Sequence, residues 1–288
     1  MRGDVLNYDY QIQRLALGVK FVDELSRSEI IKPVRAEIEY QSPHQSPPPR
    51  RSYSFSVQGK KAPSGLLRST AGNYSLVYYP GIQDQLDLRV YDYDRHYIPR
   101  RLRVPLLTLE QVLTIEENED PDYFAGRQRE VSMFPGAAYH GQSRQTGIRG
   151  RVLRDGEPMR WAYVEAIDLI SDEVIARTRG DDRGEFLLLL PSHALQASDL
   201  SDSFDVRISI AGPAVAPVPP TPDIAAQDSF WDLPLEDVPA VGLVDNVSNG
   251  ESLPSGYTTA PSAVRTVSFQ IGRVLNGRDE ADFEFSLP

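Results

Sequence analysis

The side chains best able to do chemistry in this sequence are its four histidines, and their spacing argues against a catalytic site. His44, His96, His140 and His193 lie far apart, and none belongs to an HExxH or HxH pattern. A metal site or a catalytic triad needs groups that converge in space. The sequence also lacks a GxSxG nucleophile motif and a phosphate-binding Gly-Lys-Ser/Thr loop. We therefore expect exposed loop histidines, no catalytic residues and no enzymatic activity.

Acidic residues around Gly184 and a set of tyrosines offer two further binding hypotheses. Asp181, Asp182 and Glu185 could give oxygen ligands to calcium, which needs six or more; three acids in one turn are more often only a turn. Five tyrosines could form a surface on which sugars stack: Tyr78, Tyr79, Tyr91, Tyr93 and Tyr97. Strand tyrosines more often fill half-buried sheet positions. We therefore predict no metal and no cofactor, and keep sugar binding as an alternative.

The uneven charge points to contacts with other proteins. The net charge is −11, yet arginines crowd residues 89–103, whereas Arg207 is the one Lys or Arg between 184 and 264. Separate basic and acidic regions favour docking on neighbours or on copies of the chain, with solvated surface as the alternative. The acidic balance argues against nucleic acid as a partner. Adding two aromatic anchors, we predict as partner-binding residues Phe230, Trp231, Arg100, Arg101 and Arg103.

Short strands must hold these residues in the first third of the chain. Residues 34–40 alternate apolar and polar side chains, which is the period of a half-buried strand. Further strands are expected at 14–22, 52–58, 72–79, 86–93 and 97–106. The proline-rich residues 41–51 should form a loop, because proline has no N–H to donate to a sheet. The pattern predicts a first antiparallel β-sandwich over residues 1–106.

The rest of the chain divides into a connector and a second sandwich. Residues 107–145 have few periodic apolar side chains and should be an irregular connector, with one short helix that Thr108, Glu110 and Gln111 could cap. Strands are then expected at 147–153, 161–167, 174–179, 186–190, 204–210, 267–271 and 282–287. An insertion at about 211–264 is rich in Ala, Pro and Asp and is long for a loop in a compact domain. We assign residues 146–288 to this second sandwich.

One stretch of the second sandwich carries a family resemblance. Residues 150–191 read GRVLRDGEPMRWAYVEAIDLISDEVIARTRGDDRGEFLLLLP. The pattern lies at Gly150, Val152, Asp155, Gly156, Pro158, Ala162, Val164, Thr178, Asp181, Gly184 and Phe186. It resembles the carboxypeptidase regulatory-like family, a prealbumin-like β-sandwich, although its first turn is one residue short and Arg179 and Gly180 are inserted before Asp181. The resemblance implies a fold and says little about function, because such modules position other domains.

A second stretch implies a setting for the protein. Residues 92–106, DYDRHYIPRRLRVPL, are similar to a segment of proteins that accompany phage-tail-like contractile injection systems. That resemblance implies a cap, baseplate or decoration subunit.

The chain has no cysteine, which excludes disulfides and thiolate metal sites. It shows no signal peptide and no apolar run long enough to span a membrane, so we expect a cytoplasmic location within an assembled particle.

The sequence as a whole predicts an all-β protein of two antiparallel β-sandwich domains, Ig-like or prealbumin-like, joined by an irregular connector. The predicted function is that of a non-enzymatic structural subunit of a multi-protein assembly. The resemblance of residues 92–106 implies that this assembly is a phage-tail-like contractile injection system. Its partners would be other protein subunits or copies of the chain, with no nucleic acid and no direct membrane insertion. The alternative is a carbohydrate- or surface-binding module of adhesin type.

Overall fold

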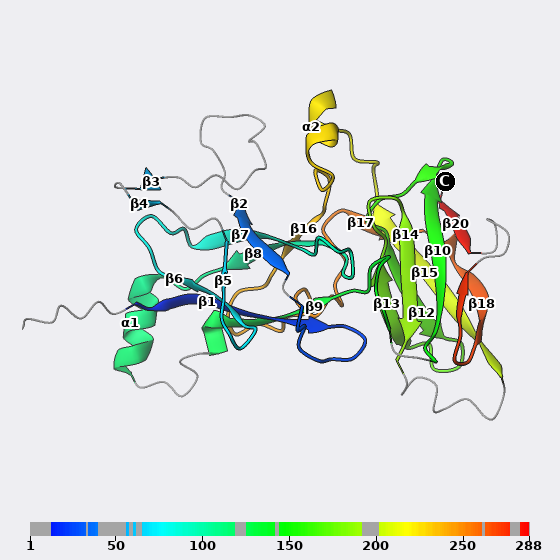
Figure 1. The fold of residues 1–288 in the computed structure, drawn as a ribbon, viewed down its shortest axis with the longest axis horizontal. Helices are drawn as coiled ribbons and strands as arrows, with labels where there is room; N and C mark the ends of the chain where they lie inside the picture. Colours follow the sequence, from blue (N-terminus) through cyan, green and yellow to red (C-terminus); the bar gives the residue numbers. More distant parts are fainter. Residues whose placement is uncertain are drawn as a thin grey trace, which may run out of the picture.

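The computed structural model describes residues 13–32, 34–39, 56–57, 60–61, 65–118, 125–141, 144–191, 202–260, 263–276 and 283–287. Their fold is almost entirely β, as predicted, and consists of two sandwiches placed next to each other along the longest axis of the molecule (Figure 1). His44, His193 and the proline-rich segment 41–51 lie outside these residues. No helix in the described part of the chain is long and apolar enough to cross a membrane.

The first sandwich consists of two four-stranded sheets. One contains, in order, β5 (Leu67–Arg68), β6 (Tyr74–Val77), β1 (Leu15–Asp23) and β9 (Gln128–Met133). The other contains β16 (Leu235–Asp237), β8 (Arg100–Pro105), β7 (Gln85–Tyr91) and β2 (Arg35–Glu39). A separate short hairpin pairs β3 (Ser56–Val57) with β4 (Lys60–Lys61).

Alternation along the strands builds the core between these two sheets. In β8, Leu102 and Val104 are buried, and Arg103 between them is half-exposed. Ile38 of β2 and Leu88 of β7 lie in the same cluster and are 0 % and 1 % exposed. Burial of each such side chain contributes about 2 kcal/mol. The period-two pattern therefore identified the inward faces correctly.

The first sandwich differs from the expected antiparallel arrangement at β9 and β16, its last two strands in the sequence. β9 runs parallel to β1, and β16 runs parallel to β8. β9 lies within residues 107–145, where the sequence suggested an irregular connector. It was missed because only Val131 and Met133 among its six residues are apolar. The connector does contain the expected helix, α1 (Leu109–Glu117), whose N-terminus has a capping box formed by Thr108 and Gln111, and a 3-10 turn, η1 (Ala125–Arg127).

The second sandwich has two five-stranded sheets. One contains β11 (Glu157–Pro158), β10 (Thr146–Arg154), β14 (Glu185–Leu190), β19 (Val274–Asn276) and β20 (Glu284–Leu287). The other contains β13 (Val174–Arg179), β12 (Tyr163–Asp168), β15 (Ser203–Pro213), β17 (Tyr257–Thr259) and β18 (Arg265–Gln270). Every strand expected after residue 146 is present. This sandwich is also mixed, because β19 and β20 run parallel to β10.

The turn before β14 has the structure its residue types predict. Gly184 has φ +73°, and a Cβ there would lie 2.6 Å from the carbonyl oxygen of Val152. Asp181 Oδ1 accepts hydrogen bonds from the backbone N–H groups of Arg183 and Glu185 at 2.8 and 3.0 Å. Phe186 is 4 % exposed and packs in the core of the second sandwich. These contacts explain why the Asp-x-x-Gly-x-Phe spacing suits a tight turn between two strands.

The long insertion links the two sandwiches. After β15 the chain leaves the second sandwich and forms α2 (Pro222–Gln227), the yellow helix at the top of Figure 1. It then adds β16 to the first sandwich, beside β8, and returns to pair β17 with β15. Val238, which directly follows β16, lies in the first core. The sequence suggested a loop of the second domain, but in the structure this segment is shared by both.

Candidate functional site

Glu236, the middle residue of β16, lies between one arginine from each sandwich. Its carboxylate accepts hydrogen bonds from Arg100 of β8 at 3.1 and 2.7 Å, and from Arg179 of β13 at 2.7 Å to each oxygen. All three side chains are buried. Burial raises the pKa of the Glu236 carboxyl, but the two guanidinium groups outweigh it and lower this pKa to about 2. Glu236 is therefore charged at neutral pH and bonds the two halves together.

Arg100 uses every donor of its guanidinium in this junction. Besides the two bonds to Glu236, it donates to the carbonyl oxygens of Ser132 and Ser248 at 2.7 Å each and of Val247 at 2.6 Å. Five N–H groups thus meet five acceptors. Burying a charge is costly unless it is paired and hydrogen-bonded, and Arg100 is both. The residues that supply these acceptors belong to β9 and to the insertion, so Arg100 fixes both.

An aromatic ring and a glycine complete the packing at the junction. The Phe134 ring centroid lies 5.8 Å from the guanidinium of Arg100 and 4.9 Å from that of Arg179. Gly250 has φ +78°, and a Cβ there would lie 2.3 Å from Phe134 Cζ. The hydroxyl of Tyr163 in β12 donates to the carbonyl oxygen of Gly250 at 2.6 Å. Only glycine fits this position without displacing the ring.

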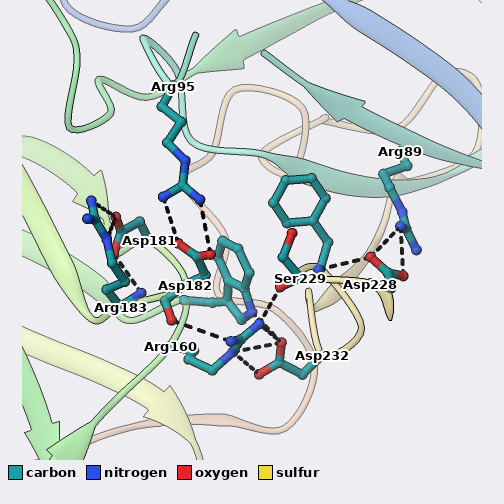
Figure 2. Close-up of polar contacts among 11 residues, drawn as sticks. Arg89, Arg95, Arg160, Asp181, Asp182, Arg183, Asp228, Ser229 and Asp232 are labelled. Carbon is teal, nitrogen blue, oxygen red and sulfur yellow. Dashed lines mark hydrogen bonds and ion pairs between the residues drawn. The ribbon is translucent and has the colours of Figure 1, made fainter. Parts of the chain in front are cut away.

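A second set of ion pairs links the insertion to both sandwiches (Figure 2). Arg89 of β7 donates to both oxygens of Asp228, at 3.0 and 2.9 Å. Four residues later, Asp232 accepts from Arg160 at 2.7 to 3.0 Å and from Trp161 Nε1 at 2.8 Å. Residues 228–232 are thus bonded to the first sandwich at one end and to the second at the other.

The five predicted partner-binding residues make contacts within the chain. Arg100 and Trp231 are 0 % and 7 % exposed, so neither can reach a partner and both predictions are corrected. The Phe230 ring is half-buried and lies between two other rings, 5.6 Å from Tyr91 and 6.0 Å from Trp161. The remaining two pair with carboxylates of neighbouring strands: Arg101 with Glu39, and Arg103 with Asp87. The arginine-rich and acid-rich regions of the sequence do attract each other, but inside one molecule.

The acidic residues of the turn at 181–185 are engaged by contacts within the chain, and three of the five tyrosines lie together. Asp181 is used by its own turn and by Arg183, while Asp182 pairs with Arg95 at 3.2 and 3.4 Å. Among the tyrosines, Tyr78 packs against the first core and donates its hydroxyl to the carbonyl oxygen of Leu107 at 2.6 Å. Tyr79 packs against the same core. The other three, Tyr91, Tyr93 and Tyr97, line one cavity between the sandwiches.

Two histidines expected to be isolated come together: His96, in the turn between β7 and β8, and His140, in the segment after β9. The rings of His96 and His140 are 5.7 Å apart. One ligand atom each from Asp92, Asp94 and His96 lie within 4.8 Å of one another, a spacing that could hold a metal ion. Asp92 already accepts from the backbone N–H groups of Asp94 and His96, at 2.9 and 3.0 Å, and its Oδ2 lies 3.2 Å from His96 Nδ1. These bonds account for the cluster as a stabilised turn.

Comparisons with known proteins return little. No protein-family model and no curated protein matches the chain. Among solved structures, a streptococcal ancillary pilin is similar with a TM-score of 0.23 and 10 % sequence identity, over 95 % of this chain and 62 % of the pilin. The chain thus spans less than two thirds of the pilin's length, and the likeness is too low to assign a family.

Proposed function

We propose that this protein is a non-enzymatic structural subunit of a multi-protein assembly. The observation that carries the proposal is the buried junction of Arg100, Glu236 and Arg179. Groups that an enzyme would direct at a substrate are here directed at each other and hold two sandwiches in one orientation. A fixed two-part body of this kind suits a protein that spaces and orients its neighbours.

The contact surface should lie on the loop between β16 and β17, because the five residues predicted from the sequence make contacts within the chain. Val241 packs against Gly126, where a Cβ would lie 2.8 Å from its Cγ1. Beyond this anchor, Leu243 and Val244 are 66 % and 83 % exposed. Exposed apolar side chains held on an anchored loop are typical of protein contacts. Within the proposal, the partners are other protein subunits or further copies of the chain.

The more specific setting that we propose is a phage-tail-like contractile injection particle assembled in the cytoplasm. Its support is the resemblance of residues 92–106. In the structure this segment contains the turn after β7 and all of β8, including Arg100. Through Arg100 the segment contributes to the buried junction, and its residue pattern would reflect the way in which the two sandwiches are joined.

The experiment is affinity co-purification from cells that produce the protein naturally. A tagged wild-type chain should bring down a fixed set of proteins in constant ratio, and this set should include sheath or tube components. The double variant Leu243→Asp/Val244→Asp should lose them by about tenfold or more, since each buried apolar contact is worth about 1–2 kcal/mol. Ile170→Asp, at a 97 % exposed position of the second sandwich, is the matched control. Recovery of the chain alone, as a monomer, would contradict the proposal.

A further inference from the structure

A cavity of about 250 Å³ lies where the two sandwiches and the insertion meet. The turn after β7, the loop around Phe230, and the segments at Trp161 and 181–182 line it. It adjoins a second cavity of about 310 Å³, with which it shares Ile98, Gly136 and Ala137. Pockets of about 300–1,000 Å³, mostly apolar with a few polar groups, are typical places for small ligands, and the two adjoining cavities together fall in this range.

One wall of the cavity is a continuous series of aromatic rings. Centroid distances are 5.2 Å between Tyr93 and Tyr91, 5.6 Å between Tyr91 and Phe230, and 6.0 Å between Phe230 and Trp161. The series begins at Tyr93, which is 71 % exposed, and ends at Trp161 in the second sandwich. A pyranose presents weakly positive C–H groups on one face, and these pack on the negative face of an aromatic ring.

The polar groups of the cavity suit hydroxyls better than charges. Asp182 and Arg95 form an ion pair at 3.2 and 3.4 Å, and the Arg95 side chain is half exposed. An acceptor and a donor side by side match a vicinal diol, in which one hydroxyl donates to the carboxylate and the next accepts from the guanidinium. A neutral ligand can make both bonds without separating the two charges.

Two of the six described non-glycine residues with positive φ line the same cavity. Arg95 has φ +57° and Trp161 has φ +59°, in the left-handed region that side chains other than glycine rarely adopt. Such conformations persist when the surrounding structure enforces them, and they cluster at ligand sites. Here they place the guanidinium of Arg95 beside Asp182, and Trp161 against Phe230.

A cationic ligand fits less well. The carboxylate of Asp181 is already paired with Arg183. One face of each of two rings already holds a guanidinium, because Arg35 lies 5.8 Å from the Tyr93 centroid and Arg160 lies 5.4 Å from that of Trp161. A cation on the remaining faces would be repelled by this positive charge, whereas a neutral ligand would not. We therefore propose that this cavity binds a neutral saccharide, stacked on the aromatic series and hydrogen-bonded to Asp182 and Arg95. This inference is independent of the assembly proposal.

The test is binding of the full chain to a panel of neutral hexose and N-acetylhexosamine oligosaccharides, by array and then by calorimetry. We expect at least one ligand whose affinity falls about tenfold or more in Tyr93→Ala and in Asp182→Asn, the loss expected of one stacking contact or one charge-assisted hydrogen bond. Tyr93→Phe keeps the ring and should retain binding. The exposed control Ile170→Ala should be unchanged.

Three results would overturn the inference. The first is no binding to any member of the panel at millimolar concentration. The second is binding that survives both Tyr93→Ala and Asp182→Asn. The third is preferential binding of an arginine-rich peptide that the same two variants abolish, which would assign the cavity to a cationic partner. Circular dichroism of each variant should show that the fold is retained, since neither mutated side chain belongs to either core.

Discussion

Replacing Glu236 by glutamine removes one charge from the centre of the junction and keeps its shape. Arg100 and Arg179, 0 % and 4 % exposed, would then face each other without a counter-ion. Breaking a buried ion pair in this way costs about 3–5 kcal/mol. The low pKa of Glu236 gives a similar figure, since a change from 4.5 to about 2 corresponds to about 3 kcal/mol. We expect the free energy of unfolding to fall by this amount and the melting temperature by about 10 °C.

Urea unfolding followed by tryptophan fluorescence is a suitable assay. The chain has two tryptophans. Trp161 is hydrogen-bonded to Asp232 of the insertion, and Trp231, the residue before Asp232, is buried. Both therefore report on the contact between the sandwiches. The matched control is Glu165→Gln, which removes a half-exposed pair with Arg177 and should cost less than about 1 kcal/mol. A Glu236→Gln variant within about 1 kcal/mol of the wild type would refute the view that this carboxylate holds the two halves together.

Two further predictions follow from the same junction. Because the pKa of Glu236 is lower in the folded chain than its ordinary 4.5, its stabilisation is complete above that value and is lost as the pH falls from about 4.5 toward 2; acid titration by circular dichroism should show a steeper loss of stability in the wild type than in Glu236→Gln, and identical profiles would contradict this. Gly250→Ala should destabilise the chain by about 1–3 kcal/mol, because it forces a side chain into the left-handed region and against Phe134, whereas Gly256→Ala, with φ +78° and open space around it, should show only the backbone part of that cost.

Local patterns predicted most of the fold. Alternation located β2, β8 and β12, and the Asp181–Gly184 turn followed from its residue types. The parallel strands β9 and β16 could not be predicted in this way. β16 has three residues, and it forms because Arg100 and the edge of β8 are available to it. A strand stabilised by distant partners leaves little periodic signal in its own sequence.

The site was predicted in composition but not in arrangement. Arginines at 100–103 and aromatics at 230–231 were identified as contact residues, and they do make contacts, yet within the molecule. Whether a basic and an acidic segment meet in one chain or between two chains depends on the path of the chain, which charge patterning does not contain. Glu236 itself carries no signal, because the two neighbouring acids of PLEDVP, Glu236 and Asp237, both resemble surface residues.

The central claim, that the protein is a structural subunit, is tested most directly by sedimentation of the untagged chain in a gentle lysate of cells that produce it. If the protein is a structural subunit, most of the chain should sediment with a large particle and stay there after the lysate is diluted. A chain that sediments entirely as a monomer under the same conditions would contradict it.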